Sequence, residues 1–420
     1  MPLLPSHPAA APTGQPPDTE AVRRHLASRA LRPGRTGVVG LELERHVVDV
    51  AEPLRPVDWR RLTGALTGLQ PPAGSSVTLE PGGQVELSTP PASGVAAAVE
   101  VLRRDAAVVD AALAEAGLAL LSVGADPVRA PVRINPGARY AAMESYFRAV
   151  GHGRDGAAMM CSTAALQLNV EAGPAGRLGD RLTHLHRLLP VLIALAGCSP
   201  LLGGRDTGMR SARQGVWQRL DPGRCAPWLR DGDPAAAWAE FALAAPVMLV
   251  RSERTGAPQP VHAPVPLVDW VRGRHLLDGR CPTLADVDLH LSTLWPPVRL
   301  RGWLELRVLD TVPAAWWPGL AAVVATVLDD VAAADRAAEA AEPVAQRHGV
   351  AARDGISDPA LGRAARGLVA AALPAVPAVL RPDVERWAEL LDSGRTPADL
   401  VRNLARRTDA AGCLLAEELR

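Results

Sequence analysis

Lysine is absent from this chain of 420 residues, whose 45 basic side chains are all arginine. This absence excludes mechanisms that depend on a lysine amine, such as the Walker-A phosphate loop and Schiff-base catalysis. Basic and acidic residues balance to a formal net charge of +0. Because no overall field attracts a polyanion, we expect neither nucleic acid nor a membrane among the partners.

Paired cysteines and long apolar runs are missing too. A reduced, cytoplasmic protein without structural zinc is the natural interpretation, because no C-x-x-C pair occurs. The five cysteines are Cys161, Cys198, Cys225, Cys281 and Cys413. The apolar run LLPVLIALAG is shorter than the ~18 residues that a membrane helix needs. The proline-rich start lacks the regions of a signal peptide, and its composition predicts a disordered tail over residues 1–18.

Residues 299–309, with the sequence RLRGWLELRVL, are predicted to form one β-strand around which the chain is organised. Alternate side chains of a strand share a face. One face therefore carries Arg299, Arg301, Trp303, Glu305 and Arg307. The opposite face is apolar and belongs to the core. Guanidinium groups flanking a carboxylate are costly to bury without a ligand, so the polar face is a candidate site.

Three more strand-like segments combine an apolar face with a face of carboxylates and amides. Their polar faces carry Glu42 and Glu44 in the first, Glu80, Gln84 and Glu86 in the second, and Gln167, Asn169 and Glu171 in the third. In the second segment, Pro81-Gly82-Gly83 marks a turn. Together the four segments predict an α+β fold containing one sheet with a polar, metal-binding face.

Helical periodicity surrounds these strands. Asp18 can cap a first helix over residues 19–31, and a long Ala/Val/Leu helix is predicted over 93–117. The last hundred residues are mostly Ala-rich helix broken by Gly and Pro. No long linker interrupts the pattern. We therefore predict a single catalytic domain over 19–420, of which 313–420 is a helical C-terminal part.

Five motifs stand in the order found in one known family. They are GxExE, EPGGQxELSxPP, MMxxTxxxQxNxxxG, SPxxxGxxxGxxSxRxxxW and HLSTxWPPVRxRGxxExR, at Gly40–Glu44, Glu80–Pro91, Met159–Gly173, Ser199–Trp217 and His290–Arg307. With them the chain resembles the glutamate–cysteine ligases of plants and many bacteria. The branch that opens ergothioneine biosynthesis in actinobacteria is the most similar. The resemblance implies a glutamine-synthetase-like fold: a curved, mostly antiparallel sheet with flanking helices and a helical C-terminal region.

The resemblance also implies an activity. Family members use ATP and Mg²⁺ to join the γ-carboxylate of glutamate to the amine of cysteine through a γ-glutamyl phosphate. The expected product is γ-glutamylcysteine. Two alternatives remain open: a ligase of the same family with a different amine acceptor, and a non-catalytic homologue that acts as a binding module. For an enzyme we expect small-molecule substrates, and a monomer or homodimer.

Phosphoryl transfer asks mainly for positioning and neutralisation of charge, and Mg²⁺ prefers oxygen ligands. Carboxylates drawn from separate strands to one face meet that demand. From this logic and from the resemblance we expect ATP and two or three Mg²⁺ ions to bind. The expected metal ligands are Glu42, Glu44, Glu80, Glu86, Gln167, Asn169 and Glu305.

Arginines are the expected ligands of the phosphates. Arg307, next to the catalytic Glu305, is the candidate for the γ-phosphate, because a planar guanidinium pairs well with phosphate oxygens. Arg299 and Arg301 either contact phosphates of ATP as well or form structural ion pairs.

The amino-acid substrates have candidate ligands by the family match. Arg213 resembles a position that binds the glutamate α-carboxylate, and Arg139 one on the cysteine side. Tyr140 either lines the cysteine pocket or is a core tyrosine. Gln84 is a further substrate-binding candidate.

Overall fold

The computed structural model describes residues 16–420, so most of the tail predicted over 1–18 lies outside the described residues. Its main sheet has the strand order β11-β12-β6-β1-β3-β2, and β4 and β5 also pair with β1. All of these pairings are antiparallel. The strands are β1 (Val38–Asp49), β2 (Ser76–Leu79), β3 (Val85–Ser88), β4 (Ala92–Ser93), β5 (Leu118–Leu121), β6 (Ala165–Val170), β11 (Val298–Leu300) and β12 (Leu304–Asp310). The predicted α+β fold with a mostly antiparallel sheet is confirmed.

The prediction of one continuous strand over 299–309 is wrong, because β11 and β12 form a hairpin. Gly302 has φ +90°, a conformation that residues with a side chain rarely adopt, and it turns the chain. The turn is held from outside: the Gly302 N–H donates to Ala30 O at 2.9 Å, and the Arg32 N–H donates to Gly302 O at 2.9 Å. Arg299 and Glu305 become cross-strand partners and stay on one face.

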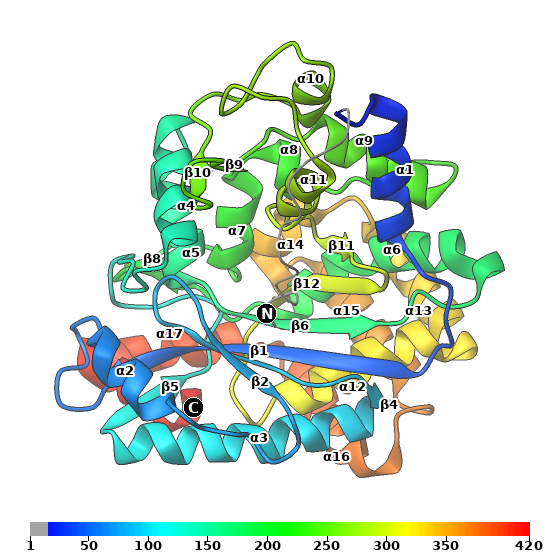
Figure 1. Cartoon of the computed structure of the whole chain (residues 1–420). Coiled ribbons are helices and arrows are strands. Elements are labelled where there is room, and N and C mark those ends of the chain that lie inside the picture. The colour runs from blue at the N-terminus through cyan, green and yellow to red at the C-terminus, as the bar shows by residue number, and fades with distance from the viewer. Residues whose placement is uncertain (1–15) are drawn as a thin grey trace.

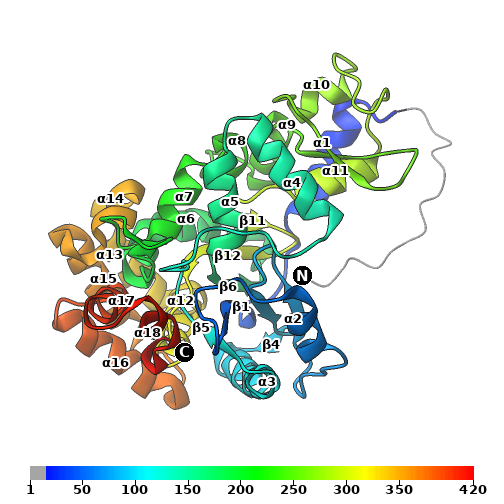
Figure 2. The ribbon, with the colours of Figure 1, turned by 90° about the vertical axis from the view of Figure 1, so that its left-hand side faces the viewer.

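The apolar face of the sheet carries the core. Helices α3 (Val95–Glu115), α6 (Leu178–Ala196) and α12 (Trp317–Asp329) contact β1, β12 and β6 (Figures 1 and 2). The buried strand residues include Leu41, Leu43, Leu166, Leu168, Leu304 and Leu306. Each such leucine contributes about 2 kcal/mol by leaving water. This packing fixes the sheet, so that the opposite, polar face is presented on a rigid support.

The polar face looks toward a second group of helices, drawn above the sheet in Figure 1. The helices outside the C-terminal part, besides α3 and α6, are α1 (Thr19–Ala30), α2 (Trp59–Leu66), α4 (Ala138–Ala149), α5 (Gly153–Ser162), α7 (Ala212–Arg219), α8 (Pro222–Cys225), α9 (Pro234–Ala244), α10 (Leu267–Val271) and α11 (Leu284–Leu291). Asp18 caps α1 as predicted, accepting from the Ala21 N–H at 2.7 Å. Two small sheets, β7 (Leu201–Leu202) with β8 (Arg205–Asp206) and β9 (Leu249–Arg251) with β10 (Pro258–Pro260), lie in the connections.

The C-terminal part is helical, as predicted. After α12 come α13 (Val331–Ala341), α14 (His348–Asp354), α15 (Pro359–Ala372), α16 (Arg381–Asp392), α17 (Pro397–Arg407) and α18 (Ala410–Leu415). Within residues 16–420, no single helix is long and apolar enough to cross a membrane; one pair, Trp317–Asp329 with Val331–Val344, passes by length and composition but is bent by 102°. The division into domains stays a prediction.

Candidate active site

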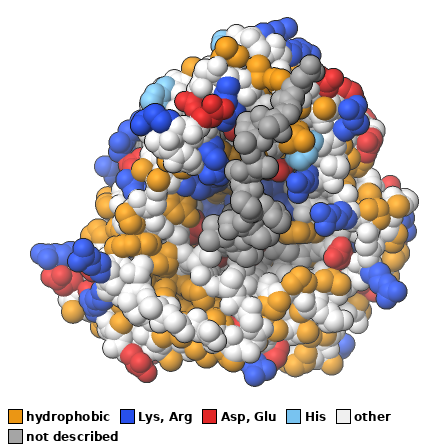
Figure 3. All heavy atoms as spheres, in the orientation of Figure 1, with side chains coloured by type: hydrophobic (Ala, Val, Ile, Leu, Met, Phe, Trp, Pro, Cys, Tyr) orange, Lys and Arg blue, Asp and Glu red, His pale blue; other side chains and the backbone are white. Residues whose placement is uncertain are grey.

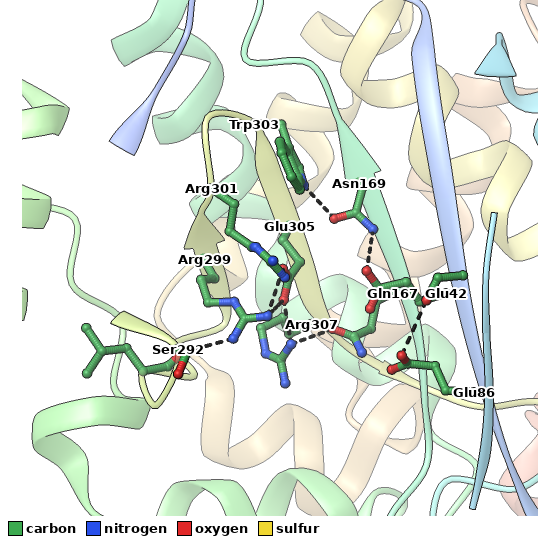
Figure 4. A network of polar contacts seen from close by, with 12 residues as sticks. Glu42, Glu86, Gln167, Asn169, Ser292, Arg299, Arg301, Trp303, Glu305 and Arg307 are labelled. Carbon is green, nitrogen blue, oxygen red and sulfur yellow. Dashed lines mark hydrogen bonds and ion pairs between the residues drawn. The ribbon is translucent and has the colours of Figure 1, made fainter. Parts of the chain in front are cut away.

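Four carboxylates meet on the polar face of the sheet, and we call them the acid cluster: Glu42, Glu44, Glu80 and Glu86. Glu44 of β1 is paired directly with Glu86 of β3, an arrangement that destabilises a sheet when nothing compensates it. The carboxyl groups of Glu42 and Glu86 point toward each other (Figure 4). The strands thus hold like charges together at a cost in stability.

The repulsion between these carboxylates appears in the raised pKa values of Glu42, Glu44 and Glu80. Burial, with the charge of Glu86 added, raises the pKa of Glu42 to about 8 and that of Glu44 to about 7. Burial together with the charges of Glu86 and Glu44 raises the pKa of Glu80 to about 8. In each case burial and the neighbouring carboxylates outweigh the nearby arginines, so the ionised form is only partly compensated. The acid cluster is therefore built to accept positive charge.

Two amides from β6 lie between the acid cluster and the arginines. The Gln167 side chain donates to Glu44 Oε1 at 2.9 Å, and the Asn169 side chain donates to Glu42 Oε1 at 3.1 Å. On its other side Gln167 Oε1 accepts from Arg307. These amides orient the carboxylates, and the Ala165 N–H holds the other oxygen of Glu44 at 2.7 Å. The structure brings both to the polar face, as the alternation along β6 predicted.

On the other side of β6 lies a group that we call the arginine cluster: Arg299, Arg301 and Arg307 around Glu305 (Figure 4). Glu305 is completely buried; Arg299 Nη2 lies 2.7 Å from its Oε1, and Arg301 Nη1 lies 3.5 Å from its Oε2. Burial raises the pKa of Glu305, but Arg299, Arg307 and Arg301 outweigh burial and bring it to about 2. One carboxylate cannot neutralise three guanidinium groups, so the cluster keeps excess positive charge.

Arg307 owes its position to a β-bulge. The register between β12 and β6 shifts between Leu306 and Leu309, so the carbonyls of Arg307 and Val308 leave the ladder. Helix α7 captures both: Arg213 Nη2 donates to Arg307 O at 2.8 Å, and Gln214 Nε2 donates to Val308 O at 2.8 Å. The Nε and Nη1 of Arg213 are buried without a hydrogen-bond partner. Arg213 and Arg307 are thereby joined in one rigid unit.

Asp310, at the end of β12, holds that unit in place, and sequence reasoning missed it. Its buried carboxylate accepts from Ser199 Oγ at 2.6 Å, Ser211 Oγ at 2.8 Å and the Cys198 N–H at 2.9 Å. The hydroxyl of Ser211 also caps α7, accepting from the Gln214 N–H at 3.1 Å. A signal for this cluster was present in the sequence, because Ser199 and Ser211 both belong to the Ser199–Trp217 motif.

Arg139 and Tyr140 enter the site from α4. Arg139 Nη2 donates to Ser292 O at 3.1 Å and to Ser292 Oγ at 3.0 Å, and both residues are half-buried. Burial, and then the charge of Glu80, raises the pKa of the Tyr140 hydroxyl. Tyr140 is half-buried, packs against a buried apolar cluster and lies near the acid cluster, so both predicted roles stay open.

Gln84 and its turn have a structural use. The Gln84 amide donates to Met160 O at 3.3 Å and Thr163 O at 2.9 Å, which ties the EPGG turn to the end of α5. A Cβ on Gly82 would lie 2.3 Å from Cys161 O, so only glycine fits. This contact places Glu80 beside the other carboxylates. Substrate binding by Gln84 stays a prediction, with its Oε1 buried and unpartnered.

Basic side chains gather in the upper half of the face drawn in Figure 3. A cavity of about 160 Å³ adjoins Arg307 and is lined in part by Trp217, Trp295 and Cys225. The indole Nε1 of Trp217 is buried without a partner. The sequence did not predict this aromatic cavity, although Trp217 ends one of the five motifs. It offers a partly open space for a small ligand next to the arginine cluster.

Comparison with known proteins identifies the family. The model of glutamate–cysteine ligase family 2 matches residues 38–418. The chain belongs to this family. It is 50% identical to the glutamate–cysteine ligase EgtA of Mycobacterium tuberculosis over 385 residues, 91% of this chain and 89% of that protein. The EgtA of Mycolicibacterium smegmatis is 46% identical over 90% of each chain.

More distant family members share parts of the chain. The chloroplastic glutamate–cysteine ligase of Medicago truncatula is 29% identical over 58% of this chain and 50% of its own. Among solved structures, the glutamate–cysteine ligase of Francisella tularensis in complex with AMP matches with a TM-score of 0.57 at 15% identity, covering 93% of this chain and 88% of that one. The family, the ligase class and the fold expected from the motifs are confirmed.

The acid cluster of this family member suits a hard cation. Within residues 16–420, no group of three or more His, Cys, Asp or Glu side chains is arranged so that it could hold a metal ion by itself. Mg²⁺ does not ask for one, since it usually takes one or two carboxylates and completes its shell with phosphates and waters. Oxygen donors whose ionised forms are only partly compensated fit that role. Glu305 differs, because its oxygens are already engaged by arginines.

Proposed function

We propose that this chain is an ATP-dependent glutamate–cysteine ligase that makes γ-glutamylcysteine for ergothioneine biosynthesis. The observation that carries the proposal is the placement of the acid cluster and the arginine cluster side by side on one rigid sheet face. A reaction between ATP and two amino acids gathers charge of both signs. The 50% identity to a mycobacterial glutamate–cysteine ligase adds the substrate pair.

In the first step a γ-carboxylate oxygen of glutamate attacks the γ-phosphorus of ATP, and the bond to ADP breaks. Negative charge then builds on the transferred phosphoryl group, and catalysis consists mainly of holding and neutralising it. Arg307 is the group placed for this, since it is oriented by Glu305 and Gln167. Arg299 and Arg301 add positive charge, although both also pair with Glu305.

Glu42, Glu44, Glu80 and Glu86 would hold the two or three Mg²⁺ ions, with Gln167, Asn169 and Glu305 as the remaining candidate ligands. Bound Mg²⁺ supplies neutralisation of the phosphate oxygens. The raised pKa values of Glu42, Glu44 and Glu80 support this assignment, because a cation would relieve their repulsion.

In the second step the amine nitrogen of cysteine attacks the acyl carbon, phosphate leaves, and the nitrogen loses a proton. Arg213 would bind the α-carboxylate of glutamate. Its Nε and Nη1 make no hydrogen bond, although Nη1 lies 3.8 Å from Asp310 Oδ1, and this supports the role. Arg139 and Tyr140 would face cysteine from α4. Both substrates are thus held beside the phosphoryl group by groups from elements outside the sheet.

The test is incubation of the purified chain with Mg-ATP, glutamate and a panel of amines, followed by ADP release and product mass. We expect γ-glutamylcysteine and ADP in equal amounts, and little turnover without cysteine. Faster turnover with another amine would mean that this amine, and not cysteine, is the natural acceptor. No turnover with any amine would overturn the assignment as an enzyme.

The remaining expectations are part of the same proposal. We propose a cytoplasmic enzyme, supported by five cysteines that are all free, working as a monomer or homodimer on small-molecule substrates. Fractionation of the native host and light scattering of the purified chain test these two points.

A further inference from the structure

Trp303 is an exposed tryptophan at the edge of the site. It is 37% exposed and, among the large hydrophobic residues exposed within residues 16–420, it is the one aromatic. It directly follows the Gly302 turn and directly precedes β12, and its side chain lies on the same side as Glu305 (Figure 4). Exposed indole has a cost in water, so a ring kept at the mouth of a polar site points to a ligand with an apolar face.

The ring is held firmly by its edge. Trp303 Nε1 donates to Asn169 Oδ1 at 2.7 Å (Figure 4), and the Arg301 Cζ lies 5.5 Å from the ring centroid. The hydrogen bond fixes the edge of the indole, and Arg301 covers one face, which leaves the opposite face for stacking. Arg301 connects the ring to the arginine cluster, because it also reaches Glu305. A planar group on the indole would therefore lie next to concentrated positive charge.

The spacing along β12 matches a nucleotide. Trp303 directly precedes β12, Glu305 is two residues further on and Arg307 is four; at the rise of an extended strand these separations are about 7 Å and at most about 14 Å, since the bulge after Leu306 bends the strand. An extended nucleoside triphosphate with its base at Trp303 would run past Arg301 and bring its terminal phosphate near Arg307. We propose that Trp303 is the stacking platform for the adenine of ATP. This inference rests on the proposed function, since it assigns the base end of the same substrate.

The experiment compares Trp303→Ala with Trp303→Phe. Phe keeps an aromatic face and loses the hydrogen bond to Asn169, so it separates stacking from anchoring. We expect the ATP KM to rise about 5- to 100-fold in Trp303→Ala and little in Trp303→Phe, because base–aromatic stacking is lost only in the first. The KM values for glutamate and cysteine should stay near wild type in both. Trp59→Ala, on the distant helix α2, is the matched control.

A second measurement needs no turnover. Equilibrium dialysis with AMP should show weaker binding to Trp303→Ala than to wild type, whereas inhibition or binding by tripolyphosphate, which has no base, should be equal for the two. Equal AMP affinities, or equal losses for AMP and tripolyphosphate, would overturn the platform. If Trp303→Ala is insoluble, Trp303→Leu, which keeps bulk without an aromatic face, takes its place.

The failure of this inference can be told apart from the failure of the proposed function. An active wild type whose Trp303→Ala variant has an unchanged ATP KM refutes the platform alone. A wild type that binds AMP through Trp303 but makes no dipeptide refutes the ligase reaction and leaves the platform standing.

Discussion

The acid cluster and the arginine cluster occupy the same sheet face and are out of balance in opposite directions. Three guanidinium groups surround one carboxylate at Glu305, whereas the acid cluster gathers four carboxylates, and their mutual repulsion adds to the effect of burial. The pKa of Glu305 falls to about 2 while the pKa of Glu42 rises to about 8. Identical side chains on one sheet thus experience opposite fields.

The two fields could cancel if the clusters were mixed, and the fold keeps them apart. The amides of β6 stand between them: Gln167 touches Glu44 on one side and Arg307 on the other. The neutral amide of Gln167 orients the side chains on both sides by hydrogen bonds and adds no charge of its own. The separation keeps one patch ready for cations and the next ready for phosphate, which is what a substrate that carries both, such as Mg-ATP, requires.

The largest effect is expected from removing Arg307, the arginine of the cluster that also contacts Gln167. Arg307→Ala should lower kcat about a thousandfold, because the charge that develops on the phosphoryl group loses its nearest guanidinium. Single-turnover ADP release measures the effect. Arg154→Ala, an exposed arginine on α5, should leave the rate unchanged; a loss below tenfold in Arg307→Ala would remove it from the reaction.

The same substitution on the two sides should change stability in opposite directions. Glu305→Gln leaves the buried Arg299 and the half-buried Arg301 and Arg307 without their carboxylate and should cost about 3 kcal/mol of unfolding free energy. Glu42→Gln relieves repulsion and should raise the thermal midpoint of the metal-free chain at pH 8. Urea unfolding and calorimetry check the pair. If both variants are destabilised alike, the two clusters do not differ in charge balance.

Arg213→Ala tests whether the unit formed with Arg307 also binds substrate. Loss of a charged contact should raise the glutamate KM about 10- to 100-fold and the ATP KM much less. Initial rates at varied glutamate and varied ATP give the two constants. A similar rise in both would mean that Arg213 only supports Arg307 through its carbonyl.

Much of the site followed from the period-2 alternation of short strands. The alternation put Glu42 and Glu44 on one face of their strand, and Gln167 and Asn169 on one face of another strand. The structure pairs these two strands, so the four side chains share one face of the sheet. Alternation says nothing about where a strand bends. The 299–309 segment therefore read as one strand, although Gly302 turns it back, since a glycine in a strand pattern can be a gap or a turn.

Contacts between residues far apart in the sequence could not be predicted from local patterns. The bulge at Arg307 depends on α7, whose Arg213 and Gln214 take up the freed carbonyls across 94 residues of chain. Gln84 alternates with Glu86 in sequence, yet its amide is used by carbonyls of Met160 and Thr163. Such partners come from tertiary packing, which no local pattern encodes.

The smallest expected effect concerns pH and magnesium at the acid cluster. The pKa values of Glu42, Glu44 and Glu80 are raised in the folded chain to about 8, 7 and 8 from an ordinary 4.5. The folded state then binds more protons than the unfolded state, so these groups lower stability as pH rises from about 5 to 8. Mg²⁺ binds ionised carboxylates, and its stabilising effect should grow over the same range.

Thermal midpoints with and without Mg²⁺ at pH 5.5 and pH 8.5 measure this coupling, with NaCl at matched ionic strength as the control. We expect a shift of a few degrees at pH 8.5 and a smaller one at pH 5.5. Glu42→Gln combined with Glu80→Gln should remove most of the difference, because fewer carboxylates remain to lose protons. Arg307→Ala should keep the difference, since its charge lies on the other side of β6. An Mg²⁺ shift that is the same at both pH values would mean that the acid cluster does not bind the ion.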